Sequence, residues 1–502
     1  MGKDDFLLKS SGYSSHSRRQ RRKFLRVLPY IVLVSILAIL LCIAAYLYMR
    51  NKSLETRGVL GEVYTASDPS MQGPDPGNQG AAGTAGDSSE SQDAAEASAN
   101  ANSLESYLNR ANLIAAGYDY DAAIALLNES PYASDEQVTA AIAGFEETKN
   151  TLVRADPKKV THVFFHTLIM DTSKAFDGDS REKGYNQMMT TKEEFMKILQ
   201  SMYDRGFVLV KLHDVAYETT GEDGNPHFVQ GDIMLPPGKQ PFVMSQDDVC
   251  YYEYMVDDGF ATKMIIGEDG KPTNEMKLED GSVLVGSYDL VPLLDDFIEE
   301  HPDFSYKGAK AVIALTGYNG ILGYRTAPSY DSDEYRAKNP GFDYAKEREE
   351  AAKVAECLKE NGFELASHSW GHRNMGTISM ENFRADTDKW EAEVETLIGP
   401  CDIILFPFGS DIGGWMPYDT SGERYQYLHS KGFRYFCNVD SSQYWVQIGD
   451  DYMRQGRRNL DGFRMYYDLP ETNPTKDHLS DLFDVTEVFD RRRPTPVAKM
   501  SE

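Results

Sequence analysis

The chain has 502 residues, with 51 Lys and Arg against 79 Asp and Glu, and a formal net charge of −28 at pH 7. This length allows one large domain with appendages, and the acidic excess excludes nucleic acid and anionic lipid as expected partners. Five cysteines are too few for a disulfide framework, so buried thiols are expected, with one bridge between Cys401 and Cys437 left open.

The first fifty residues predict a membrane anchor. Residues 27–49 form an uncharged apolar run that is long enough, at ~1.5 Å per residue, to cross a ~30 Å hydrocarbon layer. No small-x-small cleavage site follows it, which favours an uncleaved transmembrane helix over a signal peptide. Residues 1–26 are rich in Arg and Lys and are predicted to be a cytoplasmic tail. The expected topology is therefore a single-pass cell-membrane protein with an extracellular C-terminal domain.

Two segments of different composition come next. Residues 50–102 are rich in Gly, Ala, Ser and Asp and predict a disordered linker. Residues 103–155 predict a helical hairpin stalk, with helices over 104–128 and 136–153. The sequence pattern within 104–128 resembles one tetratricopeptide-type hairpin, but a single copy of such a repeat is a weak match. A stalk that packs on the following domain is the preferred interpretation.

Residues 156–490 predict the catalytic domain, because strand-length apolar runs alternate there with helical patterns. Gly206, Gly362 and Gly432 each stand between a helical pattern and a phenylalanine that opens a strand. The strand-length runs are 160–165, 207–212, 241–245, 311–315, 363–367, 403–407, 433–437 and 463–467. The helical patterns are 191–205, 290–301, 344–361, 380–397 and 424–431. This alternation predicts a parallel α/β barrel, with an open doubly wound sheet as the alternative.

Two insertions interrupt the alternation. Residues 220–239 and 258–285 carry repeated Glu-Asp-Gly turn signals and predict hairpins that wall a cleft beside Asp247. The basic run 491–493 is expected to be a solvated tail.

Polar residues follow three of the predicted strands, and the turn Pro407-Phe408-Gly409 follows a fourth. His166, the pair Asp247-Asp248, and His368 each come directly after an apolar run, and the chemistry of α/β barrels lies at the carboxyl ends of their strands. One carboxylate with the imidazoles of His368 and His372 forms a ligand set suited to a zinc-class ion. The second aspartate can accept a proton from an attacking water. These residues predict a metal-dependent hydrolase.

At these motifs the chain resembles the polysaccharide deacetylases, the NodB-homology group of carbohydrate esterase family 4. The resemblance covers about 160–467 and rests on Asp247-Asp248 and on His368-Ser369-Trp370-Gly371-His372. It implies a distorted (β/α) barrel that removes N-acetyl groups from glycans with a divalent metal, Zn²⁺ being the expected ion. It also implies Asp248, His368 and His372 as metal ligands and Asp247 as the catalytic base.

Two family positions differ in this chain. The family often has Arg-x-Pro-Tyr where this sequence reads Leu405-Phe406-Pro407-Phe408, so the arginine that steadies the base is missing there. Arg325 is a candidate replacement, although a surface arginine is the preferred interpretation. The family's late histidine is also missing. A subgroup similar to exported poly-N-acetylglucosamine deacetylases carries it on the first strand, which implies His166 as the general acid.

The predicted function is hydrolysis of N-acetyl groups from an extracellular amino-sugar polymer of the peptidoglycan or poly-N-acetylglucosamine type. Trp370, Pro407 and Phe408 are the candidate substrate-binding residues, with packing of the barrel rim as the alternative role for Trp370. The alternative function is a catalytically inactive, deacetylase-like protein that binds cell-wall glycan.

Overall fold

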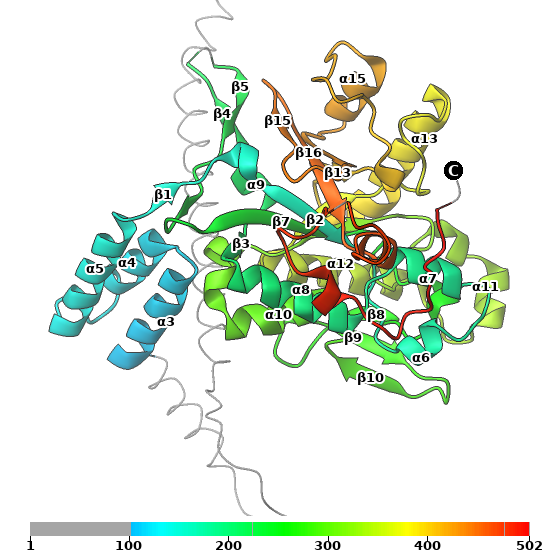
Figure 1. Ribbon diagram of the computed structural model, residues 1–502, viewed down its shortest axis with the longest axis horizontal. Helices are drawn as coiled ribbons and strands as arrows, with labels where there is room; N and C mark the ends of the chain where they lie inside the picture. The colour runs from blue at the N-terminus through cyan, green and yellow to red at the C-terminus, as the bar shows by residue number, and fades with distance from the viewer. Residues whose placement is uncertain (1–101, 223, 476, 501–502) are drawn as a thin grey trace, which may run out of the picture. The chain divides into compact units, whose positions relative to one another are not determined.

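A computed structural model describes residues 102–222, 224–475 and 477–500. Its centre is a closed barrel of seven parallel strands, which lie in the middle of the view in Figure 1. In order around the barrel, they are β2 (Thr161–Phe165), β7 (Gln240–Gln246), β11 (Val312–Leu315), β12 (Glu364–Ser367), β13 (Ile403–Leu405), β14 (Tyr435–Val439) and β16 (Met453–Asn459). The predicted barrel is confirmed, and the open-sheet alternative is excluded.

Strand β7 explains why the barrel is distorted. Its first half pairs with the short strand β3 (Phe207–Leu209), while its second half pairs with β11 on that side. A strand therefore forms within the predicted run 207–212. It pairs with the start of β7 and is not an eighth strand of the barrel. Strand β15 (Val446–Ile448) adds to β16 in the antiparallel direction.

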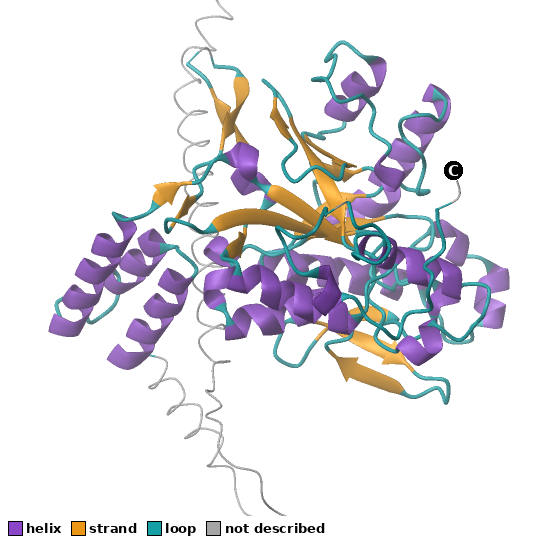
Figure 2. Cartoon of the chain, viewed as in Figure 1, coloured by secondary structure: helices purple, strands orange, loops and turns teal. Residues whose placement is uncertain are grey.

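Helices surround the barrel, as Figure 2 shows in purple around the orange strands. Helix α8 (Lys192–Asp204) illustrates why they form. Thr191 and Glu194 build a capping box at its start, and the chain leaves it through Gly206 at φ 78°. Phe195, Ile198, Leu199 and Met202 are buried, at the spacing of one apolar helix face. The burial of this apolar face accounts for the position of α8 against the barrel.

The other covering helices occupy the predicted segments. Figure 1 places α8, α10 and α12 on one side of the central strands. The longer helices are α10 (Leu290–Glu300), α12 (Tyr344–Glu360), α13 (Met380–Trp390), which continues through a π-helical turn (Glu391–Glu395) into α14 (Thr396–Ile398), and α15 (Glu423–Ser430). The short helices are α6 (Thr172–Ala175), α7 (Glu182–Met188), α9 (Leu212–Val215), α11 (Asp333–Lys338), α16 (Gly462–Tyr466) and α17 (Val485–Val488).

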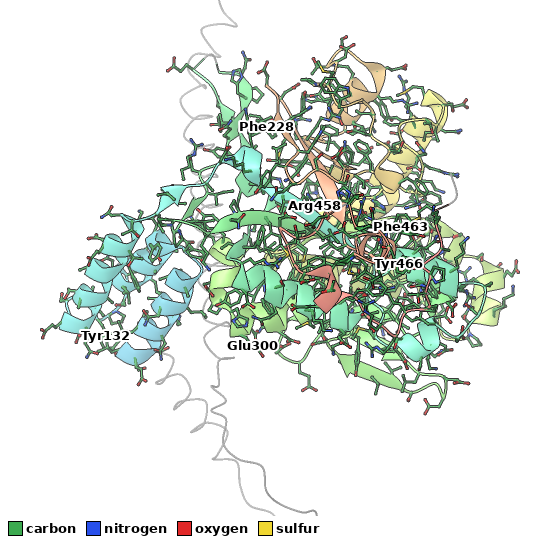
Figure 3. The ribbon with its side chains drawn as sticks, viewed as in Figure 1. Tyr132, Phe228, Glu300, Arg458, Phe463 and Tyr466 are labelled. Atoms are coloured by element: carbon green, nitrogen blue, oxygen red, sulfur yellow. The ribbon has the colours of Figure 1, made fainter. Side chains whose placement is uncertain are left out.

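The prediction for the last strand is wrong. Residues 463–466 lie in helix α16 and Tyr467 ends it, and the strand that closes the barrel is β16 (Met453–Asn459), sequence MRQGRRN. Figure 3 labels Arg458 of this strand and Phe463 and Tyr466 of the helix. The apolar pattern missed β16 because its buried residues include three arginines and a glutamine, which a barrel interior accepts only when each finds polar partners.

Both insertions form antiparallel strands. The first contains the hairpin β4–β5 (Ala216–Thr220 and Pro226–Gln230), and the second contains the three-stranded sheet β8, β9 and β10 (Lys263–Ile266, Pro272–Lys277 and Val283–Gly286). A small antiparallel pair joins β1 (Val153–Arg154), which precedes the barrel, with β6 (Met234–Leu235), which follows β5 in the first insertion.

The segment before the barrel contains three helices, where two were expected. They are α3 (Leu104–Ala116), α4 (Tyr120–Asn128) and α5 (Glu136–Lys149). Asp119 caps α4 and so separates it from α3. Tyr118 donates its hydroxyl to the Asp303 carbonyl at 2.8 Å, so this segment packs on the domain that follows it.

The predicted tail, transmembrane run and nearly all of the linker lie outside the described residues. Within the described ranges, no helix is both long and apolar enough to cross a membrane. The four cysteines of the barrel domain are buried, free thiols, so the bridge left open between Cys401 and Cys437 is not formed. The expected solvated tail is also corrected, because Arg493 is buried and pairs with buried Glu194.

A histidine joins two strands at the end of the barrel opposite the strand carboxyl ends. His213 bonds through Nδ1 to Glu364, the first residue of β12, and its Nε2 lies 3.0 Å from Asp402, just before β13. Burial opposes protonation, but the bonds to Asp402 and Glu364 outweigh it and raise the pKa of His213 to about 10.

This raised pKa predicts a pH-dependent stability. Because the unfolded value is ~6.5, the stabilisation is fully present below that pH and is lost as the pH rises through about 10. The difference in unfolding free energy between the parent and His213→Gln should be largest near pH 6 and should shrink toward zero above about pH 10. The effect should be modest, since the side chain is 39% exposed. Denaturant titrations at both pH values check this. His429→Gln is the control, because burial lowers the pKa of His429, and a similar high-pH loss there would contradict the explanation.

Candidate active site

The carboxyl ends of the barrel strands surround a pocket of about 430 Å³. It contains the side chains that the sequence placed after β2, β7, β12 and β13. The lining residues are Phe164, His166, Met188, Met189, Asp247, Asp248, His368, His372, Phe408, Gly409, Val439, Asn459, Asp461, Phe463, Arg464 and Met500. None comes from the two insertions, so the expectation that they wall the cleft is wrong for this pocket.

Asp248, His368 and His372 lie together in this pocket. One ligand atom from each residue lies within 4.8 Å of the others, and His372 Nε2 is 3.6 Å from Asp248 Oδ2. Two atoms bound to one zinc ion lie at most ~4.4 Å apart. A carboxylate and two imidazoles in this arrangement therefore fit a zinc-class ion after small side-chain adjustments.

The neighbours of each side chain favour metal binding. His368 donates Nδ1–H to the Leu405 carbonyl at 2.7 Å, which leaves Nε2 as the free lone pair. Burial lowers the pKa of His368, so its imidazole is neutral. Asp248 Oδ1 accepts the Tyr252 hydroxyl at 2.8 Å, which leaves Oδ2 directed toward His372.

The backbone at these ligands is strained. Asp248 and His372 have φ values of 59° and 49°, and Ser369 between the two histidines has φ 55°. Non-glycine residues pay a conformational penalty in this left-handed region and tend to cluster at functional sites. Asp386 compensates in the histidine loop, because its carboxylate accepts the backbone N–H groups of Trp370 and Gly371 at 2.8 and 2.9 Å.

A metal site of this kind predicts that no single ligand is dispensable. His372→Ala should lose most of the zinc-class metal that the purified parent retains after dialysis, because two protein ligands would remain. Elemental analysis measures the metal per chain. His429→Ala, a histidine outside the pocket, is the matched control, and equal metal content in the two variants would contradict the assignment.

Arg457 on β16 is the functional neighbour that the sequence reading missed. Its Nη1 lies 2.6 Å from Asp247 Oδ1, and both side chains are buried. Burial opposes ionisation of Asp247, but the adjacent guanidinium outweighs it and holds the pKa of this carboxyl well below its usual range. A cation expected at position 405 and absent there is thus supplied beside Asp247 by Arg457 of β16.

A buried polar chain orients Arg457. Its Nη1 also donates to Ser245 Oγ at 3.2 Å, and Ser245 Oγ is 2.9 Å from His162 Nε2. His162 Nδ1 lies 3.1 Å from Gln455 Oε1. Burial, followed by the charge of Arg457, lowers the pKa of His162, so its neutral imidazole links Ser245 and Gln455 through hydrogen bonds.

Arg325 does not replace the missing family arginine. Its guanidinium is buried and donates to the carbonyls of Cys250 and Tyr251 at 3.3 and 2.7 Å. These contacts fix the loop that follows Asp248. Arg325 therefore holds the backbone that follows Asp248, the candidate metal ligand, and does not contact Asp247.

His166 lines the pocket together with Asp461, an acid that the sequence reading did not single out. Asp461 is 3% exposed. Burial raises the pKa of Asp461, and His166 is among the groups that oppose this rise. No sequence motif marks Asp461, because it follows the strand that was not recognised.

The three candidate substrate-binding residues have different surroundings. Phe408 lines the pocket, is 69% exposed and packs against the His372 ring at 4.5 Å. Pro407 is buried, and neither it nor Trp370 lines the pocket. The Trp370 indole donates to Glu393 at 2.7 Å and covers Gly317, whose added Cβ would lie 2.2 Å from the ring. Packing explains Trp370 better than sugar binding.

Comparison with known proteins finds one family model and two solved structures that are similar to the chain. A family model described as polysaccharide deacetylase matches residues 331–419, a stretch that includes His368 and His372 but not Asp247 and Asp248. No curated protein sequence matches the chain. Two solved structures are similar, each at 10% identity with a TM-score of 0.32 and 64% of this chain covered. One is the Streptococcus pyogenes deacetylase PplD in complex with acetate, covered over 97% of its chain, and the other is a Bacillus anthracis protein classified as a polysaccharide deacetylase, covered over 67%.

Proposed function

We propose that the protein is a metal-dependent hydrolase that removes N-acetyl groups from an extracellular amino-sugar polymer. The observation that carries this proposal is the placement of Asp248, His368 and His372 beside the buried pair of Asp247 and Arg457. A binding protein needs no ionised base next to a metal ligand set. The match of residues 331–419 to the polysaccharide deacetylase model supports the same reaction class.

The roles of the residues follow from their geometry. A divalent ion of the zinc class, held by Asp248, His368 and His372, would supply Lewis-acid chemistry. Arg457 holds Asp247 Oδ1 and keeps the carboxylate ionised, while Oδ2 lies 3.8 Å from His368 Nε2 and so faces the ligand set. Asp247 Oδ2 accepts the proton of the attacking water.

The leaving amine needs a proton donor on the other side of the pocket. We assign this role to His166, which lines the same pocket as Asp247 and Asp461 and interacts electrostatically with both. Asp461, a buried acid of the same pocket, adds a negative charge that acts on His166. This pair takes the place of the late histidine that the chain lacks.

The inactive glycan-binding alternative loses its main support. It rested on the absence of an arginine at position 405 and of a late histidine. Arg457 occupies the position beside the base that such an arginine would take, and His166 offers an imidazole in the same pocket.

Acetate release tests the proposal directly. The purified protein, loaded with zinc and separately with other divalent metals, is incubated with N-acetylglucosamine oligomers and with peptidoglycan, and free acetate is quantified. Acetate that depends on added metal is the expected result. No acetate from any acetylated glycan with any metal would reject the function.

His166→Ala should lower kcat by the ~10²–10⁴ typical of a lost acid or base, with metal content and melting temperature unchanged. Both are measured together with acetate release. A variant that folds, holds metal and deacetylates at the parental rate would remove His166 from the mechanism.

We further propose that the domain lies outside the cell on an anchor formed by residues 27–49, because that run is apolar and the basic residues precede it. Protease added to intact cells should release the domain by cutting before residue 103. Protection of the domain would reverse this orientation.

A further inference from the structure

We propose that the pocket selects an amino sugar that carries an anionic substituent, a carboxylate or a phosphate, near the acetamido group, and that Arg464 binds this substituent. The inference rests on the proposed function and narrows its substrate class. It concerns the side of the pocket formed by β16 and α16, whose residues Arg458, Phe463 and Tyr466 are labelled in Figure 3.

Arg464 is the only Lys or Arg among the described residues that line the pocket. Its Nε donates to Asn459 Oδ1 at 3.2 Å. No carboxylate within the described ranges pairs with its guanidinium, although the chain carries a net charge of −28. Among the described residues, none accepts a hydrogen bond from its two terminal nitrogens, Nη1 and Nη2.

The three arginines of β16 provide the contrast. Arg454, Arg457 and Arg458 each pair with an aspartate at 2.6–2.7 Å. Folding has thus provided a carboxylate for every neighbouring guanidinium except the one in the pocket. This difference indicates that the partner of Arg464 comes from outside the chain.

Asp461 is close to Arg464 but is already occupied. Its Oδ1 accepts the backbone N–H of Arg464 at 2.7 Å, and its Oδ2 accepts the Asn459 amide at 2.6 Å. Asn459 is thereby oriented with its carbonyl oxygen toward Arg464 Nε. The chain Asp461–Asn459–Arg464 fixes the stem of the guanidinium and leaves its terminal nitrogens available, as a prepared anion receptor requires.

The size of the pocket limits where the anion sits on the substrate. At about 430 Å³, the pocket is near the lower end of the ~300–1,000 Å³ range of small-molecule sites. It therefore holds a short piece of glycan. Since Asp248 and His372 line the same pocket, the group bound by Arg464 must lie on the sugar that presents its acetamide or on the adjoining one.

Selectivity follows from desolvation. A neutral sugar that fills the pocket removes water from the Arg464 guanidinium and offers no countercharge, whereas a carboxylate or phosphate replaces the lost hydration with charge-assisted hydrogen bonds. A site that leaves a buried charge unpaired rejects the neutral analogue.

The test compares three substrates that share one acetamido sugar. They are neutral N-acetylglucosamine oligomers, glycan strands whose N-acetyl sugar also bears a lactyl carboxylate, and N-acetylglucosamine units that bear a phosphate. The metal-loaded parent is compared with Arg464→Gln, with Arg464→Lys, and with Arg491→Gln as the matched control, since Arg491 is exposed and pairs with Glu471.

The parent should prefer the anionic substrates. Arg464→Gln should raise their KM and lower kcat/KM by roughly 10- to 100-fold, the range of one lost charge-assisted contact, while the neutral substrate changes little and the melting temperature stays constant. Arg464→Lys should recover part of the loss, because it keeps the charge but not the planar fork. The anionic substrate that the parent prefers shows whether Arg464 binds a carboxylate or a phosphate. An equal loss on neutral and anionic substrates, or no preference in the parent, would overturn the inference.

A binding measurement separates this inference from the proposed reaction. Calorimetric titration with N-acetylmuramic acid, N-acetylglucosamine 6-phosphate and N-acetylglucosamine reports recognition without turnover. If the anionic sugars bind more tightly to the parent but not to Arg464→Gln, recognition stands even where no acetate is released and the proposed function fails. If acetate is released from neutral oligomers and the three sugars bind alike, the function stands and the anion receptor is rejected.

Discussion

Asp247→Asn should lower kcat for acetate release by ~10²–10⁴, the typical cost of losing a general base. The amide has the shape of the carboxylate and can still accept the Arg457 bond at Oδ1, but it cannot take a proton from water. Metal content should stay close to parental, because Asp247 is not among the three clustered ligands. Acetate release, metal per chain and melting temperature are measured on the same preparation.

The control for this change is Asp461→Asn, a second buried acid of the same pocket that does not contact Arg457. It should retain more activity than Asp247→Asn, because Asp461 takes no proton from the attacking water and acts through its neighbours His166, Asn459 and Arg464. The melting temperature of Asp247→Asn should also fall, since the buried Arg457 loses its countercharge, so kcat is compared well below the transition. Parental kcat in folded, metal-loaded Asp247→Asn would contradict the assignment of the base.

The barrel could be predicted because its strands and helix ends follow local rules. Continuous apolar runs marked β2, β7, β11 and β12, which are buried along their lengths. Gly206, Gly362 and Gly432 all adopt positive φ, as the helix-to-strand junctions require. These features depend on residues that are neighbours in sequence, and such features are readable without a structure.

Strand β16 could not be predicted because its side chains are stabilised by distant partners. Arg457 faces Asp247, and Gln455 faces His162, contacts that join residues more than two hundred positions apart. A run with three arginines reads as solvated when each is judged alone. The same reason explains Arg493, whose partner Glu194 lies at the start of α8.

The residues of the candidate site also divide into those that local sequence patterns reveal and those that depend on distant partners. Asp248, His368 and His372 could be proposed together because they lie in the loops that follow two recognisable strands, β7 and β12, and parallel strands deliver their carboxyl ends to one edge. The sequence did not reveal the charged residues on the other side of the pocket. These are Arg457, on the unrecognised strand β16, and Asp461 and Arg464, at the helix that follows it. The orientation of Trp370 could not be read from the sequence either, because its indole is turned toward Glu393 and Gly317 by contacts between distant residues.

Replacing Arg457 with methionine should have the second large effect. Methionine retains much of the apolar stem but leaves Asp247 as an uncompensated buried charge, and breaking a buried pair in this way costs about 3–5 kcal/mol. Denaturant unfolding measures that loss. Turnover should fall as well, because Asp247 Oδ2 is no longer held toward the metal ligands. Arg458→Met, on the same strand but paired with Asp481, is the matched control and should lose stability while keeping its kcat.

A double-mutant cycle tests whether Arg457 acts through Asp247. If Arg457 serves only to ionise and orient the base, then adding Arg457→Met to Asp247→Asn should cause little further loss of kcat, because the base is already gone. Stability should behave in the same non-additive way, since the double variant buries neither charge and can be more stable than either single variant. Additive losses of kcat would mean that Arg457 contributes to the reaction independently of Asp247, for example by contacting substrate. The fully buried position of Arg457 argues against such contact. We therefore expect the double variant to lose no more kcat than Asp247→Asn alone.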